Sequence, residues 1–266
     1  MANQTIGFIG AGNMGGALAR AVRRALPNAE ILLSNRRLEK SQALAEELGG
    51  QAATNIHIAQ KCDTIFLGVK PYLIQQVLEE IFPYLKGRNQ YQPLIISMAA
   101  RITLEDLEKW AGPAPVIRIM PNTPVSIGKG VTLYTLGDAA VEAHRGRLTE
   151  LLSASGSLIE IPEAQMNTAG VVSGCGPAFV DLFLEALADG AVYCGVPREL
   201  ALQLAAEMVV GAAALAAESK IHPGALKDAV CSPGGSTIRG VRKLEQGGLR
   251  SAVMDAVIAS TGKEKE

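Results

Sequence analysis

The sequence has few of the residues that build metal centres or disulfide frameworks. Its 266 residues include four cysteines, which lie far apart and never in a C-x-x-C arrangement, and three histidines, which form no cluster. Zinc sites and disulfide-stapled folds need these residues at short, regular spacings. We therefore expect no bound metal, and we interpret the cysteines as reduced thiols of a cytoplasmic protein.

Excess charge and long apolar runs are also missing. The formal net charge is −1 and 19% of the residues are charged, which excludes a basic surface for nucleic acid and a disordered acidic tail. The N-terminal stretch lacks the basic leader and cleavage site of a signal peptide. The most apolar run, residues 208–217, is shorter than the roughly 20 residues that span a bilayer. We expect a soluble protein with a small-molecule partner, and contacts with neither nucleic acid nor membrane.

A glycine-rich turn close to the N-terminus organises the rest of the chain. The apolar stretch 6–9 is typical of a short buried strand, and the pattern Gly10-x-Gly12-x-x-Gly15 follows it directly. In this arrangement Gly10 closes the turn, Gly12 leaves room for phosphates, and Gly15 lets the following helix lie close to the strand. A strand, these glycines and an amphipathic helix in this order predict a dinucleotide site rather than a plain structural turn.

The second predicted strand ends in a basic stretch without a carboxylate. In NAD-binding versions of this fold, an Asp or Glu about 20 residues past the glycines holds the ribose 2′-hydroxyl. Here Asn35 occupies that position between Ser34 and Arg36, and Arg37 and Lys40 follow. Because a guanidinium pairs with a 2′-phosphate and a carboxylate would repel it, the stretch favours NADPH, with NADH as the alternative. The other interpretation is a solvated basic loop at the start of a helix.

Strands and helices alternate over residues 1–162. The expected strands are residues 6–9, 31–33, 52–55 (a short strand and turn), 64–69, 94–98, 116–120, 132–136 and 158–161, and the expected helices are residues 13–25, 38–48, 72–82, 103–110 and 139–155. This alternation predicts an α/β domain of the Rossmann type, doubly wound around a mostly parallel sheet. Because parallel strands end at one edge of a sheet, Lys70 and Pro71 should face the cofactor.

The remaining residues, 163–266, are expected to form an all-helical domain. The expected helices are residues 165–172, 177–194, 198–219, 223–230, 237–246 and 249–260. Residues 179–194 and 200–217 are apolar around most of the helix circumference, and a domain of about 100 residues has too few layers to bury them. We therefore predict a homodimer that is built on this domain, rather than a self-sufficient helical bundle.

Two glycine-rich stretches in this half are expected to bind an anion. Residues 173–178, Ser-Gly-Cys-Gly-Pro-Ala, and residues 232–237, Ser-Pro-Gly-Gly-Ser-Thr, each precede a predicted helix. The unpaired N–H groups of a helix N-terminus favour a negative group, and a carboxylate is a natural small one. Thr237 adds a hydroxyl that can both donate and accept. The alternative is that both stretches are ordinary helix-entry turns.

Together, these motifs resemble the pyrroline-5-carboxylate reductase family over about residues 5–260. The resemblance is carried by the glycine turn with Asn13 and Met14, by Val69-Lys70-Pro71, by Met120-Pro121-Asn122-Thr123-Pro124, by residues 173–178 and above all by residues 228–238, Asp-Ala-Val-Cys-Ser-Pro-Gly-Gly-Ser-Thr-Ile. It implies NAD(P)H-dependent reduction of 1-pyrroline-5-carboxylate to L-proline, the last step of proline biosynthesis. It also implies dimers through the helical domain that often assemble further, commonly into decamers.

The resemblance also implies a set of site residues. Cofactor contacts are implied at Ile9, Gly10, Ala11, Gly12, Asn13, Met14, Ser34, Asn35, Arg36, Asn55, Gly68, Val69, Lys70, Pro71, Met98, Ala99 and Ala100. Substrate contacts are implied at Glu163, Ser232, Gly235, Ser236 and Thr237. The chain departs from the family pattern at Arg101, where glycine is usual, and at Ser236, where alanine or threonine is commoner.

Thr237 is the predicted catalytic residue. A cyclic imine carbon accepts hydride most readily when its nitrogen is protonated, so the protein needs only to position and polarise the ring. The Thr237 hydroxyl would bond the ring nitrogen while backbone N–H groups before it hold the carboxylate. One alternative is a related imine or hydroxyacid oxidoreductase, but the hydroxyacid enzymes use a catalytic lysine on the long interdomain helix, and no lysine lies between Pro177 and Ser219. The other alternative is a non-catalytic NADP-binding sensor.

Overall fold

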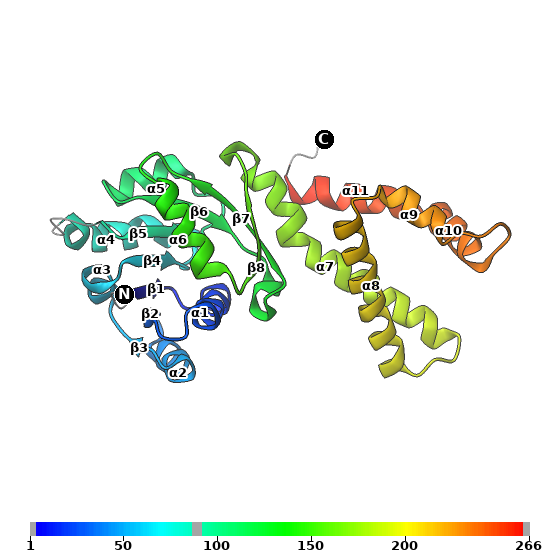
Figure 1. Cartoon of the computed structure of the whole chain (residues 1–266), viewed down its shortest axis with the longest axis horizontal. Coiled ribbons are helices and arrows are strands. Elements are labelled where there is room, and N and C mark those ends of the chain that lie inside the picture. The colour runs from blue at the N-terminus through cyan, green and yellow to red at the C-terminus, as the bar shows by residue number, and fades with distance from the viewer. Residues whose placement is uncertain (1–3, 87–91, 263–266) are drawn as a thin grey trace. The chain divides into compact units, whose positions relative to one another are not determined.

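The chain divides into two compact units, Met1–Gly174 and Cys175–Glu266. The structure, a computed structural model, describes residues 4–86 and 92–262. All strands of the described residues lie in the first unit, and the second unit is helical (Figure 1). The division falls inside one long helix, which begins in the first unit and ends in the second.

The first unit is built on an eight-stranded sheet with the order β3-β2-β1-β4-β5-β6-β7-β8 (Figure 1). The strands are β1 (Thr5–Ile9), β2 (Glu30–Ser34), β3 (Gln51–Ala52), β4 (Thr64–Leu67), β5 (Leu94–Ser97), β6 (Val116–Met120), β7 (Gly130–Leu136) and β8 (Gly156–Glu160). Neighbouring strands are parallel, except that β7 runs antiparallel to β6. The strand order reverses between β1 and β4, where open α/β sheets bind their ligands. The predicted mostly parallel α/β fold is confirmed.

Helices cover both faces of this sheet. They are α1 (Asn13–Ala25), α2 (Leu38–Leu48), α3 (Asn55–Lys61), α4 (Ile74–Lys86), α5 (Leu104–Ala111) and α6 (Glu142–Leu152), with the short 3-10 helices η1 (Pro71–Leu73) and η2 (Thr123–Ile127). One apolar core lies between the sheet and α1, α2 and α6, and the other lies between the sheet and α3, α4 and α5. Ile6 and Phe8 enter the first core and Ile9 the second, so these strands are apolar on both faces. The Phe8 ring stacks on Phe66 with centroids 4.6 Å apart.

Helix α3 is an element that the sequence pattern did not predict. Its seven residues are too few to show a clear helical period, and the preceding residues 52–55 were interpreted as a strand and turn. The Thr54 side chain accepts a hydrogen bond from the His57 N–H at 3.1 Å and so caps the helix. Helix α5 has a cap of the same kind, because Thr103 Oγ1 accepts from the Asp106 N–H at 3.1 Å.

The helix that joins the two units is continuous, so the predicted turn at residues 173–178 is wrong. Helix α7 (Glu163–Tyr193) runs without interruption through Pro177. Proline lacks the N–H that would bond the carbonyl four residues earlier, which here is that of Ser173. This carbonyl instead accepts a hydrogen bond from Asn122 Nδ2 at 2.9 Å. Because the stretch is helix interior, its backbone N–H groups are not available to an anion.

Tertiary contacts from β6 and the residues just after it hold the first turns of α7. Positions 118, 120 and 122 share one face, since successive residues of an extended chain point to opposite sides. Arg118 bonds the first turns of α7, and Asn122 bonds the Ser173 carbonyl. Between them, Met120 packs so closely on Gly170 that a Cβ there would lie 1.9 Å from the Met120 sulfur. Glycine at position 170 therefore allows the helix to approach the strand.

The second unit has almost no core of its own. Besides the end of α7 it contains α8 (Arg198–Ser219), α9 (Pro223–Ala229), α10 (Ser236–Gln246) and α11 (Leu249–Ser260). Among its described residues, the buried hydrophobic side chains are those of Ala188, Ala201 and Ala205. By length and composition alone, α7 and α8 could each cross a membrane, and only 11% of the most apolar window of each is buried in the chain. These apolar surfaces require a partner that covers them.

Candidate active site

Each of the three positions of the first turn is occupied by glycine for a different structural reason. Gly10 has φ +96°, and a Cβ there would lie 2.5 Å from the backbone of Gly68 and Val69. A Cβ on Gly15 would lie 2.5 Å from the Gly10 carbonyl oxygen. Beside Gly12, in contrast, nothing lies within 4 Å of the position of a Cβ. The packing of the chain itself requires Gly10 and Gly15, whereas Gly12 leaves space open for a ligand.

A cleft of about 620 Å³ opens at the carboxyl ends of β1, β2, β4 and β5. Most of the predicted cofactor residues line it, namely Gly10, Gly12, Asn13, Met14, Asn35, Arg36, Gly68, Val69, Lys70, Pro71, Met98, Ala99 and Ala100. Arg37, Lys40, Tyr72 and Leu73 also line it, although they were not among the predicted contacts. Each of these four lies within a few residues of a predicted contact, so the basic stretch and the Lys-Pro motif already marked their segments.

Four predicted cofactor residues lie outside the lining of this cleft. Ile9 is buried in β1, and Ala11 lines a smaller neighbouring pocket. The Ser34 hydroxyl donates to Asn55 Oδ1 at 2.6 Å, and Asn55 Nδ2 donates to Glu80 Oε2 at 2.9 Å. Ser34 and Asn55 thus tie the end of β2 to the start of α3. Their direct contact with a cofactor stays a prediction.

The cleft is electropositive at the end of β2. Arg36, Arg37 and Lys40 line it there, and no carboxylate stands among the described residues of its wall. The side chain of Asn35 is already occupied, since its Nδ2 donates to the Ala11 carbonyl at 3.0 Å and its Oδ1 accepts from the Arg37 N–H at 3.3 Å. This arrangement favours a phosphate over a ribose hydroxyl.

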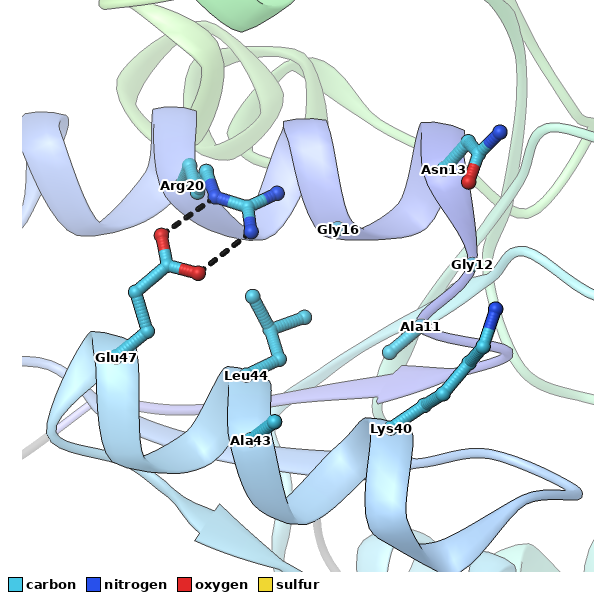
Figure 2. A pocket seen from close by; sticks show the side chains of 9 residues that line it. All are labelled: Ala11, Gly12, Asn13, Gly16, Arg20, Lys40, Ala43, Leu44 and Glu47. Carbon is cyan, nitrogen blue, oxygen red and sulfur yellow. Dashed lines mark hydrogen bonds and ion pairs between the residues drawn. The ribbon is translucent and has the colours of Figure 1, made fainter.

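A second pocket of about 280 Å³ lies between α1 and α2, beside the glycine turn (Figure 2). Arg20 donates through Nε and Nη2 to the two Glu47 oxygens at 2.6 and 2.5 Å. This bidentate bond lowers the pKa of the Glu47 carboxyl and raises that of Arg20. Lys40 lines both pockets, and Figure 2 shows its side chain directed toward the glycine turn. Glu47 balances the positive charge of Arg20 in this ion pair. Lys40 is therefore the cation of this pocket that forms no ion pair within the described chain.

Glu163, the first residue of α7, is held by the first unit. Its Oε1 accepts from Arg118 Nη1 at 2.9 Å and from the Leu104 N–H at 2.6 Å. Arg118 Nη2 also donates to Asn167 Oδ1, one helical turn further, at 3.0 Å. The first turns of α7 are thereby fixed to β6 and to the start of α5. The predicted contact of Glu163 with substrate stays a prediction.

The other predicted substrate residues lie at the start of α10. Gly235 is the N-cap, with its N–H bonded to the Ser232 carbonyl at 3.0 Å, and Ser236 and Thr237 form the first turn. The preceding Gly234 has φ +71°, a conformation that glycine adopts without strain. The first N–H groups of a helix have no partner inside it, so this end can receive an anion. In the described part of the chain, no cluster of residues suits a metal ion.

Comparisons with known proteins match both parts of the chain. A family model described as pyrroline-5-carboxylate reductase dimerisation matches residues 163–266, and one described as NADP oxidoreductase coenzyme F420-dependent matches residues 5–101. A pyrroline-5-carboxylate reductase of Pisum sativum is 38% identical over 265 residues, which cover 98% of this chain and 95% of the relative. The chain belongs to the pyrroline-5-carboxylate reductase family.

Solved structures of pyrroline-5-carboxylate reductases have the same fold. The enzyme from Coxiella burnetii matches with a TM-score of 0.88 and 31% identity, over 98% of this chain and 97% of the other. The pyrroline carboxylate reductase of Plasmodium falciparum, solved with NADP bound, matches with a TM-score of 0.86 and 31% identity, over 99% and 97%. These likenesses confirm the predicted reductase function, the use of NAD(P)H and homo-oligomerisation through the helical part.

The departure from the pyrroline-5-carboxylate reductase pattern at Arg101 has a structural counterpart. Arg101 follows the cleft residues Met98, Ala99 and Ala100, and its φ is +65°. This left-handed conformation costs a residue with a Cβ about 1–2 kcal/mol and costs glycine almost nothing. The glycine that is usual in the family therefore suits the backbone that this chain imposes on an arginine.

Proposed function

We propose that this reductase reduces 1-pyrroline-5-carboxylate to L-proline with NADPH in preference to NADH, and that Thr237 orients the substrate. The observation that carries the cofactor preference is the end of β2. There Arg36, Arg37 and Lys40 line a cleft whose described wall holds no carboxylate. The role of Thr237 is supported by its place in the first turn of α10, where a hydroxyl and unpaired N–H groups occur together.

The first unit has the features that a dinucleotide needs. The open space beside Gly12 admits a pyrophosphate to the N-terminus of α1, where the backbone N–H groups and the helix dipole attract it. Arg36 pairs with the 2′-phosphate through its guanidinium, and Lys40 adds a point charge from α2. When bound, the dinucleotide would supply the hydride that reduces the protonated C=N bond of the substrate to the C–N bond of proline.

The start of α10 holds the substrate. Its backbone N–H groups bind the carboxylate, and the Thr237 hydroxyl forms a hydrogen bond with the ring nitrogen. That bond keeps the imine carbon in position and supports the proton that the nitrogen carries. Positioning and polarisation suffice, so neither a histidine nor a metal ion is needed.

The assembly follows from the apolar helices. In a homodimer through residues 163–266, α7 and α8 of two chains cover each other, and neither helix needs a membrane. The dimers then associate into a decamer, and the enzyme works in the cytoplasm. The exposed apolar surface of both helices supports the dimer. The resemblance to the family supports the decamer.

Replacing Thr237 tests the mechanism. Thr237→Val keeps the volume and removes the hydroxyl, so we expect kcat for pyrroline-5-carboxylate reduction to fall about 100-fold. The Kd for NADPH should stay the same, because the change lies outside the cofactor cleft. The oxidation of NADPH is followed by absorbance, and Kd by fluorescence titration. Thr149→Val, on the exposed face of α6, is the matched control. An unchanged kcat in Thr237→Val removes this residue from the mechanism.

A further inference from the structure

Arg118 is a buried arginine in the middle of the sheet. Arg118 is 2% exposed and lies on β6 between Ser97 of β5 and Thr135 of β7. Its Nε has no hydrogen-bond partner among the described residues. A buried ion pair is a poor source of stability, since the loss of hydration offsets much of the attraction. An apolar residue would suit this strand better, so stability alone does not account for Arg118.

The bonds of Arg118 place one carboxylate in one orientation. Its Nη1 bonds Glu163 Oε1, and its Nη2 bonds Asn167 on the next turn of α7. The same Glu163 oxygen accepts from the Leu104 N–H. Oε2 receives no hydrogen bond from the described residues, and the Glu163 side chain is 32% exposed. One oxygen is therefore held by two donors while the other remains available to a ligand.

This carboxylate belongs to the cofactor side of the sheet. Leu104 begins α5 and is separated by only three residues from Ala100, which lines the cleft. The loop between them follows β5 at its carboxyl end. The Leu104 N–H thus ties Glu163 to the segment that lines the cofactor cleft. A carboxylate there is suited to attract a cationic ring electrostatically.

We propose that Arg118 is a positioning residue for substrate binding, which holds Glu163 Oε1 so that Oε2 faces the positively charged ring of the protonated imine, whose single N–H is left to Thr237. The inference rests on the proposed contact between Glu163 and substrate. Arg118 itself touches neither substrate nor cofactor and acts through Glu163. The guanidinium group is needed because it has two separate donors. Nη1 holds the Glu163 carboxylate, and Nη2 holds Asn167, which fixes the rotation of the first turns of α7.

A double-mutant cycle in the full-length enzyme tests this. Glu163→Gln and Arg118→Met should each raise KM for pyrroline-5-carboxylate about tenfold and leave KM for NADPH unchanged, because in each variant the cationic ring loses an aligned opposite charge. The double variant should have the same KM for pyrroline-5-carboxylate as Glu163→Gln alone, since the effects of residues that act as one unit are not additive. Arg118→Lys keeps the charge without the guanidinium group and should recover part of the loss.

The controls separate positioning from folding. Arg147→Met removes an arginine that is only partly buried, paired with Glu150 at 2.8 Å on α6, and should leave both KM values unchanged. Should Arg118→Met fail to fold, Arg118→Lys replaces it in the same cycle. Additive effects overturn the positioning inference alone. An unchanged KM in Glu163→Gln overturns the proposed role of Glu163 and this inference with it, whereas the test of Thr237 is unaffected.

Discussion

At the scale of single residues, position 35 decides the chemistry at the end of β2. A carboxylate there would accept the ribose 2′-hydroxyl and repel a 2′-phosphate. The amide of Asn35 instead bonds the Ala11 carbonyl and the Arg37 N–H, so it braces the glycine turn. In the proposed function, recognition of the 2′-phosphate falls to the cations at 36, 37 and 40, which line the same cleft.

Replacing Arg36 should reduce the preference for NADPH. The ratio of kcat/KM for NADPH to that for NADH should fall about tenfold in Arg36→Ala, the value of one charge-assisted hydrogen bond. The two cofactors are compared in parallel at the same ionic strength, since salt screens exposed charges. Lys109→Ala, which removes an equal charge from the exposed surface of α5, serves as the control. A ratio that does not change in Arg36→Ala contradicts 2′-phosphate recognition by this residue.

At the scale of elements, α7 shows how a strand overrides a local signal. Gly174, Gly176 and Pro177 favour a break, and on their own they would end a helix. Contacts between β6 and the turns of α7 before these residues, together with the Asn122 bond to the Ser173 carbonyl, compensate for the missing N–H. The helix therefore passes from one unit into the other without a turn.

Removal of the Asn122 side chain should destabilise the protein less when residue 177 has a backbone N–H that can donate a hydrogen bond. Asn122→Ala leaves the Ser173 carbonyl without a partner and should lower the free energy of unfolding by about 1–3 kcal/mol. In a Pro177→Ala background, the new N–H can bond this carbonyl, so the same change should cost less. Urea unfolding at one fixed protomer concentration measures both values.

The Pro177→Ala background also provides the control for this test. Asn122 Oδ1 accepts from the Val131 N–H at 2.9 Å, and that loss is common to both backgrounds. The difference between the two therefore isolates the bond to Ser173. Equal losses in both backgrounds would mean that Asn122 does not substitute for the N–H that Pro177 lacks.

At the scale of the whole molecule, the helical unit depends on a second chain. Three alanines are the buried hydrophobic residues that its described part contributes, while leucines and valines of α7 and α8 are exposed. Surface of this kind is covered either by lipid or by protein, and a dimerisation family matches the same residues. Two chains that cover each other with these helices remove the apolar surface from water.

A charge on α8 should therefore weaken the assembly. Leu204 is 56% exposed in the single chain, and Leu204→Lys should weaken dimerisation by at least about tenfold, because a lysine would be buried in the interface. Sedimentation without detergent measures the dimer constant. Leu38→Lys is the matched control, since Leu38 of α2 is also 56% exposed but lies in the first unit. Equal dimer constants for both variants, or a need for detergent to extract the protein, would contradict an interface through α8.

Much of the first unit was predictable because its signals are local. Gly10 and Gly15 are required by the backbone of the turn they form, and the apolar runs of β4, β5 and β6 predict strands that are covered on both faces. The seven residues of α3 carry too little periodicity for prediction. The cleft could be predicted as an edge of the sheet, yet Tyr72 and Leu73 enter its wall only through the 3-10 turn after β4.

By itself, the sequence determined the nucleotide turn, the alternation of strands and helices, and the family, since all of these depend on neighbouring residues and short motifs. Only the tertiary structure decided that α7 is continuous and that Arg118 holds Glu163, because both depend on residues about 45 or more positions apart, whose contact no local period records. Bonds across such distances form only when the sheet places β6 beneath the helix.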